Sequence, residues 1–347
     1  MIPFTFAQQI YNELAMNKDQ RIDLLKKLGE FILSADEQWE MAKEKASYEN
    51  AWFLPEFIQY QLNHIAGEYL APHKIATWTG KYDIPVNLQS PKNVGVVMAG
   101  NIPLAGFHDF LSIFISGHRQ TIKPSSKDSV LMVEIIKKLT AWDADVSSMV
   151  SLADRLAGCD AYIATGSNNS SRYFDYYFSK YPHIIRRNRT SAGILTGDES
   201  AADLEAFADD VHLYFGLGCR NVTKLYVPKD YDFLPLLDAF KKYGWLADQS
   251  KYKNNYDYQL AVMMINKVQY MTNGSLLLQE NHGMFSPISL LNYEHYADEQ
   301  QVYRDLEGNP DVQCVVGRKA ISFGKAQRPA LNDYADKADT LQFLLDL

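Results

Sequence analysis

Cysteine is scarce in this sequence. Three of its 347 residues are cysteines, and Cys159, Cys219 and Cys314 stand far apart. An odd number of widely spaced cysteines matches neither a disulfide framework nor the paired spacing of a zinc site, so we expect no structural disulfide and no bound metal. So few cysteines also suit a reducing compartment, and we expect the protein to be cytoplasmic.

Positive charge and long apolar runs are scarce as well. The formal net charge is −8, whereas nucleic-acid binding needs clustered cations that contact phosphates. We therefore expect no nucleic-acid partner. No run of about 18 apolar residues is present, and the amino-terminal residues lack the basic start and long apolar core of a signal peptide. The sequence thus predicts neither a membrane span nor a signal peptide.

What the sequence does contain is the composition of a folded protein. Hydrophobic residues make up 47% and charged residues 22%, so enough apolar side chains are present to form a core and wholesale disorder is excluded. A chain of 347 residues is long enough for two domains or one large one.

The first part of the chain has a helical pattern. Apolar residues recur at intervals of three and four positions, and Pro55 stands where it opens a helix. The predicted helices cover residues 7–16, 21–33, 34–50 and 52–70.

From Asn93 onward the pattern changes to strands that alternate with helices. The expected strands cover residues 93–100, 119–125, 160–166, 191–197 and 223–228, and the expected helices cover 102–116, 128–142, 170–181 and 200–216. Alternation of this kind predicts β-α-β units and doubly wound parallel sheets.

Two polar residues follow the first two of these strands. Asn101 comes directly after the strand 93–100, and Lys123 stands near the end of the next strand, before Pro124. In an open α/β sheet this edge is where ligands bind, and a lysine there can reach ribose hydroxyls or a phosphate. Each residue also has a plainer explanation, because asparagine is a favoured helix cap and most lysines lie on the solvated surface.

A third turn, Thr165-Gly166-Ser167, lies between the strand 160–166 and the helix that follows it. Free backbone N–H groups at the start of a helix bind anions such as a pyrophosphate. The turn matches neither a GxGxxG fingerprint nor a GxxxxGK[ST] loop. A capped helix explains the same residues equally well.

Cys219 stands between a glycine-rich turn and a segment rich in β-forming residues, and Arg220 follows it. A thiol at a turn beside backbone N–H groups is favoured as the thiolate, which is the nucleophilic form. The usual alternative for a cysteine is a small buried apolar side chain. Cys159 and Cys314 fit that alternative.

The order of these features resembles that of the aldehyde dehydrogenase superfamily. The intervals from Asn101 to Lys123, from Lys123 to Gly166 and from Gly166 to Cys219 are 22, 43 and 53 residues. Within the superfamily the chain is similar to the acyl-CoA reductase branch, which includes the fatty-acid reductase subunit of bacterial luminescence systems. The early WFLPEFI and the closing segment 321–347 also resemble this branch. The resemblance covers most of the chain and is strongest over 93–230 and at the carboxyl terminus.

The resemblance implies the fold of that superfamily: two doubly wound α/β domains with a cleft between them and a helical amino-terminal region. A Rossmann-like cofactor domain would comprise residues 1–190 with the tail 316–347, and a catalytic domain over 191–315 would carry Cys219. Residues 71–92 alternate around Gly80, which predicts extended strands or a hairpin. Related enzymes oligomerise through such a hairpin, so a homo-oligomer is one option and the oligomeric state stays open.

The resemblance also implies a reaction. Cys219 would attack the carbonyl carbon of an acyl-CoA thioester, and the Asn101 side-chain amide with the Cys219 backbone N–H would hold the oxyanion. CoA would leave, and a nicotinamide would reduce acyl-Cys219 to an aldehyde. The residues that the resemblance assigns to cofactor binding are Lys123, Ser126, Thr165, Gly166, Ser167 and Glu280.

Two departures from the family pattern refine this reading. No carboxylate lies between His183 and Gly197, where aldehyde-oxidising relatives carry the glutamate that activates water, and its absence favours a thiol acceptor such as CoA. Ser126 stands where NAD-preferring relatives often have an acid, and Lys127 follows it, so we expect NADPH, with NADH as the alternative. The basic run Arg186, Arg187 and Arg189 either attracts phosphates or forms a solvated face.

Other assignments stay open. Glu280 is the candidate for contact with the nicotinamide ribose, but its spacing to Phe285-Ser286-Pro287 differs from the family pattern. His282 is either a proton donor to the aldehyde or a structural histidine. Alternatives to acyl-CoA reduction are reduction of an acyl phosphate or a protein-delivered acyl group, aldehyde oxidation, and non-catalytic binding of CoA or a nucleotide.

Overall fold

The computed structural model describes residues 16–347, and its chain divides into two compact units. The first unit runs to Arg187 and includes Pro329–Leu347; the second is Asn188–Arg328. We expected the chain to return to the first unit at residue 316, but residues 316–328 belong to the second. Asp210 holds them there by accepting hydrogen bonds from the N–H groups of Gly324 and Ala326 at 2.6 and 2.9 Å.

The first unit is built on a parallel sheet with the strand order β3-β2-β1-β4-β5. Buried aliphatic side chains such as Val94 and Ile163 fix the central strands in the core. The strands are β1 (Asn93–Val97), β2 (Arg119–Lys123), β3 (Val150–Leu152), β4 (Ala161–Thr165) and β5 (His183–Arg186). The order reverses at β1, which confirms the predicted doubly wound sheet.

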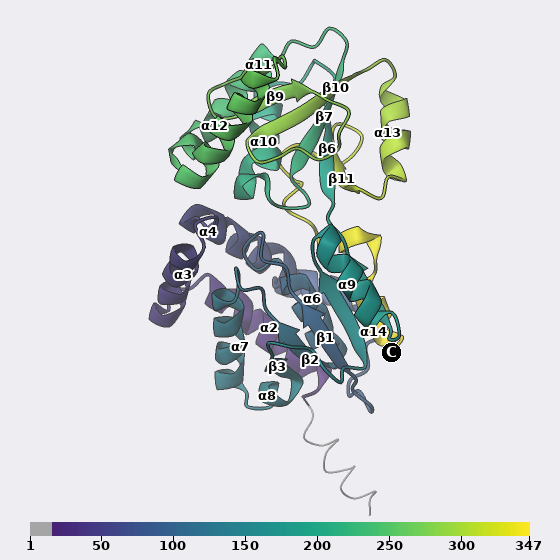
Figure 1. Cartoon of the computed structure of the whole chain (residues 1–347). Coiled ribbons are helices and arrows are strands. Elements are labelled where there is room, and N and C mark those ends of the chain that lie inside the picture. Colours follow the sequence, from purple (N-terminus) through teal and green to yellow (C-terminus); the bar gives the residue numbers. More distant parts are fainter. Residues whose placement is uncertain (1–15) are drawn as a thin grey trace, which may run out of the picture. The chain divides into compact units, whose positions relative to one another are not determined.

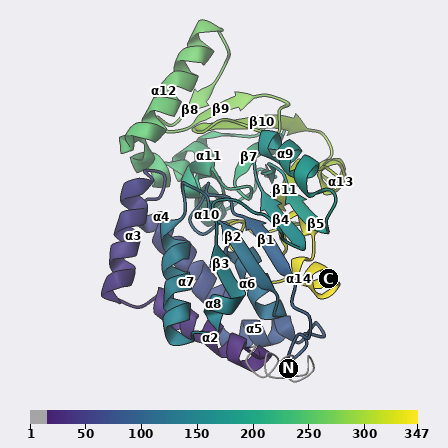
Figure 2. The same cartoon turned by 60° about the horizontal axis from the view of Figure 1, so that its bottom comes forward.

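Helices connect these strands and cover the sheet (Figure 1). Because such crossovers are right-handed and the strand order reverses at β1, α6 and α9 lie on opposite faces. The helices that follow the strands are α6 (Phe107–Ser116), α7 (Val130–Trp142), α8 (Val146–Met149) and α9 (Asn168–Phe178). Figure 2 shows α7 and α8 beside β3.

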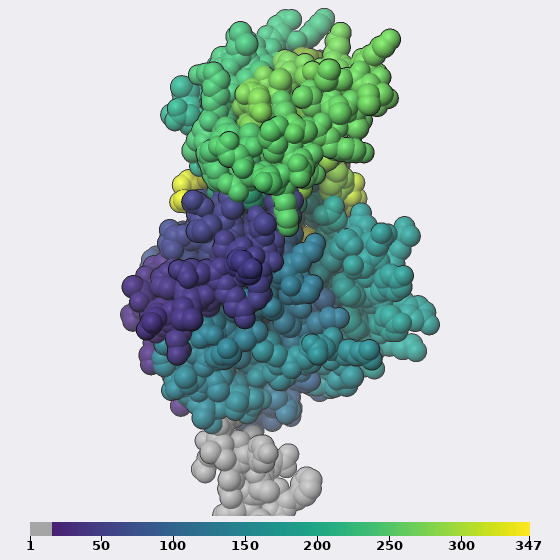
Figure 3. All heavy atoms as spheres, turned by 60° about the vertical axis from the view of Figure 1, so that its left-hand side comes forward, coloured from purple at the N-terminus to yellow at the C-terminus, as the bar shows by residue number. Residues whose placement is uncertain are grey.

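The amino-terminal helices of the first unit confirm three of the four that the sequence predicted. They are α2 (Lys18–Ile32), α3 (Glu37–Glu49) and α4 (Pro55–His64), the last continued by a π-helical turn at Ile65–Tyr69. The predicted helix 7–16 lies outside the described residues, except for Met16. Trp39 on α3 is fully buried, α3 packs against α7, and Figure 3 shows these purple helices on the surface of the first unit.

The predicted hairpin at 71–92 is wrong. All of these residues are described, and they contain no strand; they form α5 (Pro72–Thr79) followed by irregular chain. Pro72 opens the helix, where its missing N–H costs nothing. Ile75 and Trp78, three residues apart, are both buried, and the Trp78 indole donates to the Tyr334 hydroxyl at 2.8 Å. Their spacing fits a helix face, and the structural basis for an oligomerising hairpin is therefore lost.

The second unit is built on a sheet with the order β11-β6-β7-β10-β9-β8, parallel except for the β8–β9 pair. Its strands are β6 (Thr190–Ile194), β7 (Val222–Pro228), β8 (Met271–Thr272), β9 (Leu277–Glu280), β10 (Leu290–Tyr296) and β11 (Val312–Val316). Its helices are α10 (Ala201–His212), α11 (Leu234–Ala239), α12 (Ser250–Ile265) and α13 (Glu299–Glu307), with 3₁₀ segments η2 (Leu213–Gly216) and η3 (Phe240–Asp248).

The carboxyl-terminal tail carries η4 (Ala335–Lys337) and α14 (Thr340–Leu345), and a hydrogen bond from Arg186, which also belongs to a buried ion pair, holds it in the first unit. The Arg186 guanidinium donates to Asp109 on α6 at 2.5 Å and to the Thr340 hydroxyl at 2.8 Å. Both charged side chains are 7% exposed. Arg186 therefore links β5, α6 and the tail, and it is neither a solvated cation nor a ready phosphate ligand.

Replacing Asp109 with alanine is expected to lower the free energy of unfolding by about 3–5 kcal/mol, because it leaves a buried guanidinium without its counter-charge. Urea denaturation measures this loss. The matched control is Asp175→Ala, which breaks the exposed pair with Arg187, whose side chains are 42% and 64% exposed. That pair should contribute less than about 1 kcal/mol. Equal losses in the two variants would contradict the buried pair's role.

Candidate functional site

Three turns that the sequence singled out lie at one edge of the first unit's sheet. Asn101, Lys123 and the turn Thr165–Ser167 stand at the carboxyl ends of β1, β2 and β4. These strands are neighbours, and Val97 at the end of β1 is level with both Lys123 and Ala164. The structure therefore brings these candidates together at the edge where parallel α/β sheets bind ligands.

Asn101 does not cap the helix that follows it, so this alternative is wrong. The helix α6 starts at Phe107, its N-cap residue is Gly106, and no side chain caps it. Asn101 lies in the loop between β1 and α6 and is exposed. Its side chain is thus placed by the loop and has no capping role at α6.

Lys123 and Ser126 are both exposed, as is Lys127. Ser167 is exposed as well and does cap a helix: its side-chain oxygen accepts from the N–H of Ser170 at 3.3 Å, at the start of α9. The alternative prediction that this turn caps a helix is therefore confirmed for Ser167. It leaves room for an anion at the same helix start, since one cap bond satisfies only one of the first-turn donors.

Gly166 is required by close packing. A Cβ atom there would lie 2.8 Å from Cε2 of Phe174 and 2.9 Å from Cβ of Ser170. Both contacts are shorter than real side chains allow, so the turn approaches α9 only because residue 166 has no side chain. Thr165, the last residue of β4, is half-buried beside it.

Asp128 belongs to this edge and was missed by the sequence analysis. It is 8% exposed, and its Oδ2 accepts a hydrogen bond from the N–H of Leu104 at 2.7 Å. Burial raises the pKa of Asp128 to about 7. In the sequence it begins the expected helix 128–142, directly after polar residues, and no local signal separates it from a solvated acid.

In the second unit, Cys219 lies in the turn between η2 and β7 and is exposed. The alternative interpretation, a small buried apolar side chain, is therefore wrong for Cys219. It fits Cys159, which is buried, whereas Cys314 is half-buried with its Sγ 3.0 Å from the hydroxyl of Ser191. Ser191 also donates to the carbonyl of Cys219 at 3.0 Å, so β6 holds the backbone of the Cys219 turn.

The chain takes an unusual backbone path into this turn. Tyr214 and Phe215 have φ values of 54° and 58°, and Gly216 has 76°. Side chains with a Cβ rarely adopt this left-handed region. Burial of both aromatic rings, 1% and 2% exposed, holds them there.

Asn221 fixes the same turn from inside. Its Oδ1 accepts from the N–H of Gly218 at 2.8 Å, and its Nδ2 donates to the carbonyl of Leu213 at 2.9 Å. Asn221 is fully buried. Asn221 follows Cys219, and its side chain bonds residues that precede Cys219, so it closes the turn and fixes the backbone that carries the thiol, as a nucleophile requires.

Comparison with solved structures identifies the fold. The chain matches an aldehyde dehydrogenase from Pseudomonas aeruginosa with a TM-score of 0.62 and 14% identity, over 89% of this chain and 76% of that one. The chain has the fold of the aldehyde dehydrogenases. An NAD⁺ complex of an aldehyde dehydrogenase from Bacillus cereus gives a TM-score of 0.62 at 13% identity, over 87% of this chain and 72% of that one.

An indole-3-acetaldehyde dehydrogenase in complex with NAD⁺ also has this fold, with a TM-score of 0.63 at 13% identity, over 89% of this chain and 74% of that one. No family model matches the sequence, and no curated protein matches it. The likeness to the aldehyde dehydrogenase fold therefore lies in the three-dimensional structure.

The segment 183–197 of this aldehyde dehydrogenase fold contains no carboxylate. The first acids after it are engaged in their own turn. Glu199 accepts from the N–H groups of Thr196 and Gly197 at 2.7 and 3.0 Å, and Asp198 pairs with Arg318 at 2.9 Å. Both acids thus stabilise the turn that follows this segment.

Glu280 and His282 lie at the end of β9 and in the loop after it, and both are exposed. In the register of the sheet, Glu280 pairs with Tyr293 of β10, and Tyr293 pairs with Leu225 in the middle of β7. Nδ1 of His282 lies 3.1 Å from Glu294, which also pairs with the buried Lys224 at 2.8 Å. His282 thus faces a carboxylate, while the roles of both residues stay predictions.

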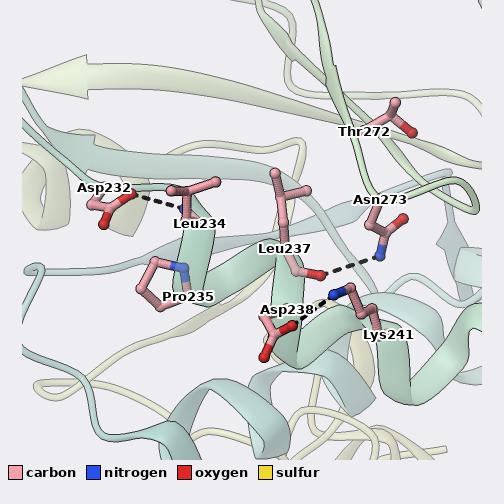
Figure 4. A pocket seen from close by; sticks show the side chains of 8 residues that line it. All are labelled: Asp232, Leu234, Pro235, Leu237, Asp238, Lys241, Thr272 and Asn273. Carbon is pink, nitrogen blue, oxygen red and sulfur yellow. Dashed lines mark hydrogen bonds and ion pairs between the residues drawn. The ribbon is translucent and has the colours of Figure 1, made fainter.

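A depression of about 490 Å³ opens beside α11 (Figure 4). Its polar groups are engaged locally: Asp232 accepts from the N–H of Leu234 at 3.0 Å, and Asp238 pairs with Lys241 at 2.8 Å. None of the candidates predicted from the sequence lines it. The lining residues are Asp232, Leu234, Pro235, Leu237, Asp238, Lys241, Thr272 and Asn273.

Two further features concern membrane spans and metal sites within residues 16–347. Within that range none of the helices combines the length and the apolar character that a membrane span requires. In the same residues, His, Cys, Asp and Glu side chains form no group of three that could hold a metal ion.

Proposed function

We propose that this protein reduces an acyl-CoA thioester to an aldehyde through a covalent acyl-Cys219 intermediate, with a nicotinamide dinucleotide as the reductant. The observation that carries the proposal is the exposed Cys219, held on a constrained turn of an aldehyde dehydrogenase fold. The missing carboxylate in 183–197 supports reduction over oxidation, because hydrolysis of an acyl-enzyme needs a base that activates water.

The first step needs only groups of this chain and the substrate. The Cys219 thiolate attacks the carbonyl carbon, a C–S bond forms, and the carbonyl oxygen becomes an oxyanion. The Asn101 amide and the Cys219 backbone N–H are the proposed donors to that oxyanion. The oxyanion collapses, the bond to CoA breaks, and the CoA sulfur leaves with the electron pair, so that acyl-Cys219 remains.

The carboxyl edge of the first unit's sheet fits a dinucleotide. Exposed Lys123 and Ser126 offer donors to ribose and phosphate oxygens, and the glycine turn at Gly166 brings backbone close to the start of α9. Two solved structures with this fold are NAD⁺ complexes. When bound, the nicotinamide supplies a hydride to the acyl carbon. Lys127 beside Ser126 favours NADPH, since a cation suits a 2′-phosphate and no acid stands at 126.

Mass spectrometry of the intact protein after brief incubation with a long-chain acyl-CoA tests the proposal. One acyl mass should be added without reductant, and peptide mapping should place it on Cys219. NADPH should discharge the adduct faster than NADH does, with release of one aldehyde per adduct. An adduct on Cys314 instead, or an adduct that water discharges to the free acid, would contradict the proposed reaction. Failure with acyl-CoA but labelling by an acyl phosphate would move the proposal to that donor.

A further inference from the structure

Two loops of the first unit leave the sheet side by side. The Asn101 loop, residues 98–106, follows β1, and the Ser126 loop, residues 124–129, follows β2. These strands are paired neighbours, and the N–H of Met98 extends their pairing by donating to the carbonyl of Lys123 at 3.1 Å. The loop with the proposed oxyanion donor thus begins beside the loop with proposed cofactor contacts.

Asp128 of the Ser126 loop bonds the far end of the Asn101 loop. Its Oδ2 accepts from the N–H of Leu104 at 2.7 Å, and the neighbouring N–H of Ala105 also lowers the pKa of the carboxyl group. Leu104 is in the left-handed region, with φ 54°. A residue with a Cβ disfavours that conformation, so the bond from Asp128 holds a backbone shape that Leu104 would not keep by itself.

The Ser126 loop is itself well supported. The N–H of Asp128 donates to the carbonyl of Ser125 at 3.1 Å, and the Asn50 side chain donates to the carbonyl of Lys127 at 3.1 Å. The two loops also touch closely, because a Cβ on Gly100 would lie 2.4 Å from the Ser125 hydroxyl oxygen. The backbone that carries Asp128 is therefore held in place, and its carboxyl group lies at a fixed position beside the Asn101 loop.

The side chain of Asp128 makes no other bonds that would explain its burial. Over residues 16–347, its Oδ1 has no hydrogen-bond partner, and its Oδ2 accepts its hydrogen bond from Leu104 of the Asn101 loop. The cations nearest in sequence, Lys123 and Lys127, are exposed. Burying a carboxyl group without a counter-charge is unfavourable, so the bond to the Asn101 loop is what this residue provides.

We propose that Asp128 is a positioning residue that locks the Asn101 loop to the Ser126 loop, so that the oxyanion donor and the cofactor contacts form one rigid edge. The catalytic consequence rests on the proposed function. The structural consequence is that the order of the Asn101 loop depends on Asp128, and this consequence does not rest on the proposed function.

Hydrogen–deuterium exchange tests the structural consequence. In Asp128→Ala, peptides that cover residues 98–106 should exchange roughly tenfold faster, because the hydrogen bond that the buried carboxyl group accepts from Leu104 is lost. Asp128→Asn should exchange close to the wild type: burial raises the pKa of Asp128 to about 7, so a neutral group of this shape already occupies the site near neutral pH. The control is Asp36→Ala, which removes an aspartate that caps α3 through the N–H of Trp39 and should leave 98–106 unchanged. Unchanged exchange in Asp128→Ala overturns the proposal.

A milder variant covers the case in which Asp128→Ala does not fold. Asn50→Ala removes the bond that supports the Ser126 loop but keeps Asp128. Exchange should then rise in 98–106 and 124–129 together. A rise confined to 124–129 would show that the loops are not coupled and would overturn the proposal.

Single-turnover acylation of Cys219 by acyl-CoA, followed by mass spectrometry, tests the catalytic consequence. Asp128→Ala should slow acylation by about 100-fold, as expected for a reacting group displaced by about 1 Å. The acyl-CoA concentration for half saturation should stay unchanged, and Asp128→Asn should restore most of the rate. Faster loop exchange with unchanged acylation would overturn the catalytic part. No adduct in the wild type would count against the proposed function, and the exchange result would still decide the positioning role.

Discussion

Replacing Cys219 with alanine is expected to abolish acyl-CoA reduction, with a loss of about 10⁴–10⁶-fold in kcat, the range found when an enzyme loses its nucleophile. The reason is that no other group of the described chain is placed as Cys219 is: exposed, at the start of β7, with the adjoining backbone bonded to Asn221 and Ser191. The measurement is the steady-state rate of NADPH oxidation with acyl-CoA, read together with aldehyde release.

Cys314→Ala is the control for this prediction. Cys314 belongs to the same unit and lies 3.0 Å from Ser191, but it is on β11 and half-buried. Its replacement should change the rate by less than about threefold, as expected when a small, partly buried side chain is truncated away from the reacting atoms. If Cys314→Ala loses as much activity as Cys219→Ala, or if Cys219→Ala remains active, the proposed nucleophile is wrong.

Replacing Asn101 with alanine is expected to lower kcat by about 10²–10³-fold, the usual effect of removing one donor to an oxyanion. The acyl-CoA KM should change little, because the bond would form only as negative charge develops on the carbonyl oxygen. Asn101 suits this role because it is exposed on a loop and does not cap α6. The measurement is kcat and KM for the same reaction, with the acylation step followed separately by mass spectrometry.

Asn93→Ala provides a matched control for Asn101. Asn93 is the same residue type, but it begins β1, whereas Asn101 lies in the loop that follows this strand; Oδ1 of Asn93 accepts from Thr121 at 3.1 Å. It lies at the opposite edge of the sheet from Asn101. Equal losses of kcat in both variants would indicate a general weakening of β1, and an Asn101→Ala effect on KM alone would indicate substrate binding without oxyanion stabilisation.

Most of the first unit's sheet was predictable because its signals are local. Buried strands such as β1 and β4 are short apolar runs that end at glycine or polar turns, and helices of matching length separate them. The prediction failed at residues 71–92, where an apparent alternation concealed the three-residue spacing of Ile75 and Trp78. It also started the helix after β1 at 102, whereas α6 begins at Phe107. The left-handed Leu104, bonded to Asp128, prevents an earlier start.

The sequence by itself determined the alternation of strands and helices, the placement of Asn101, Lys123 and Gly166 after successive strands, and the glycine-rich turn before Cys219. These follow from side-chain type and spacing along one segment. The tertiary structure alone decided that Cys219 is exposed, that Arg186 is buried against Asp109 and that Asp128 bonds the Asn101 loop. The physical reason is distance along the chain: the partners are separated by 77 residues for Arg186 and 24 for Asp128. The burial that makes such bonds matter exists only once the core has formed.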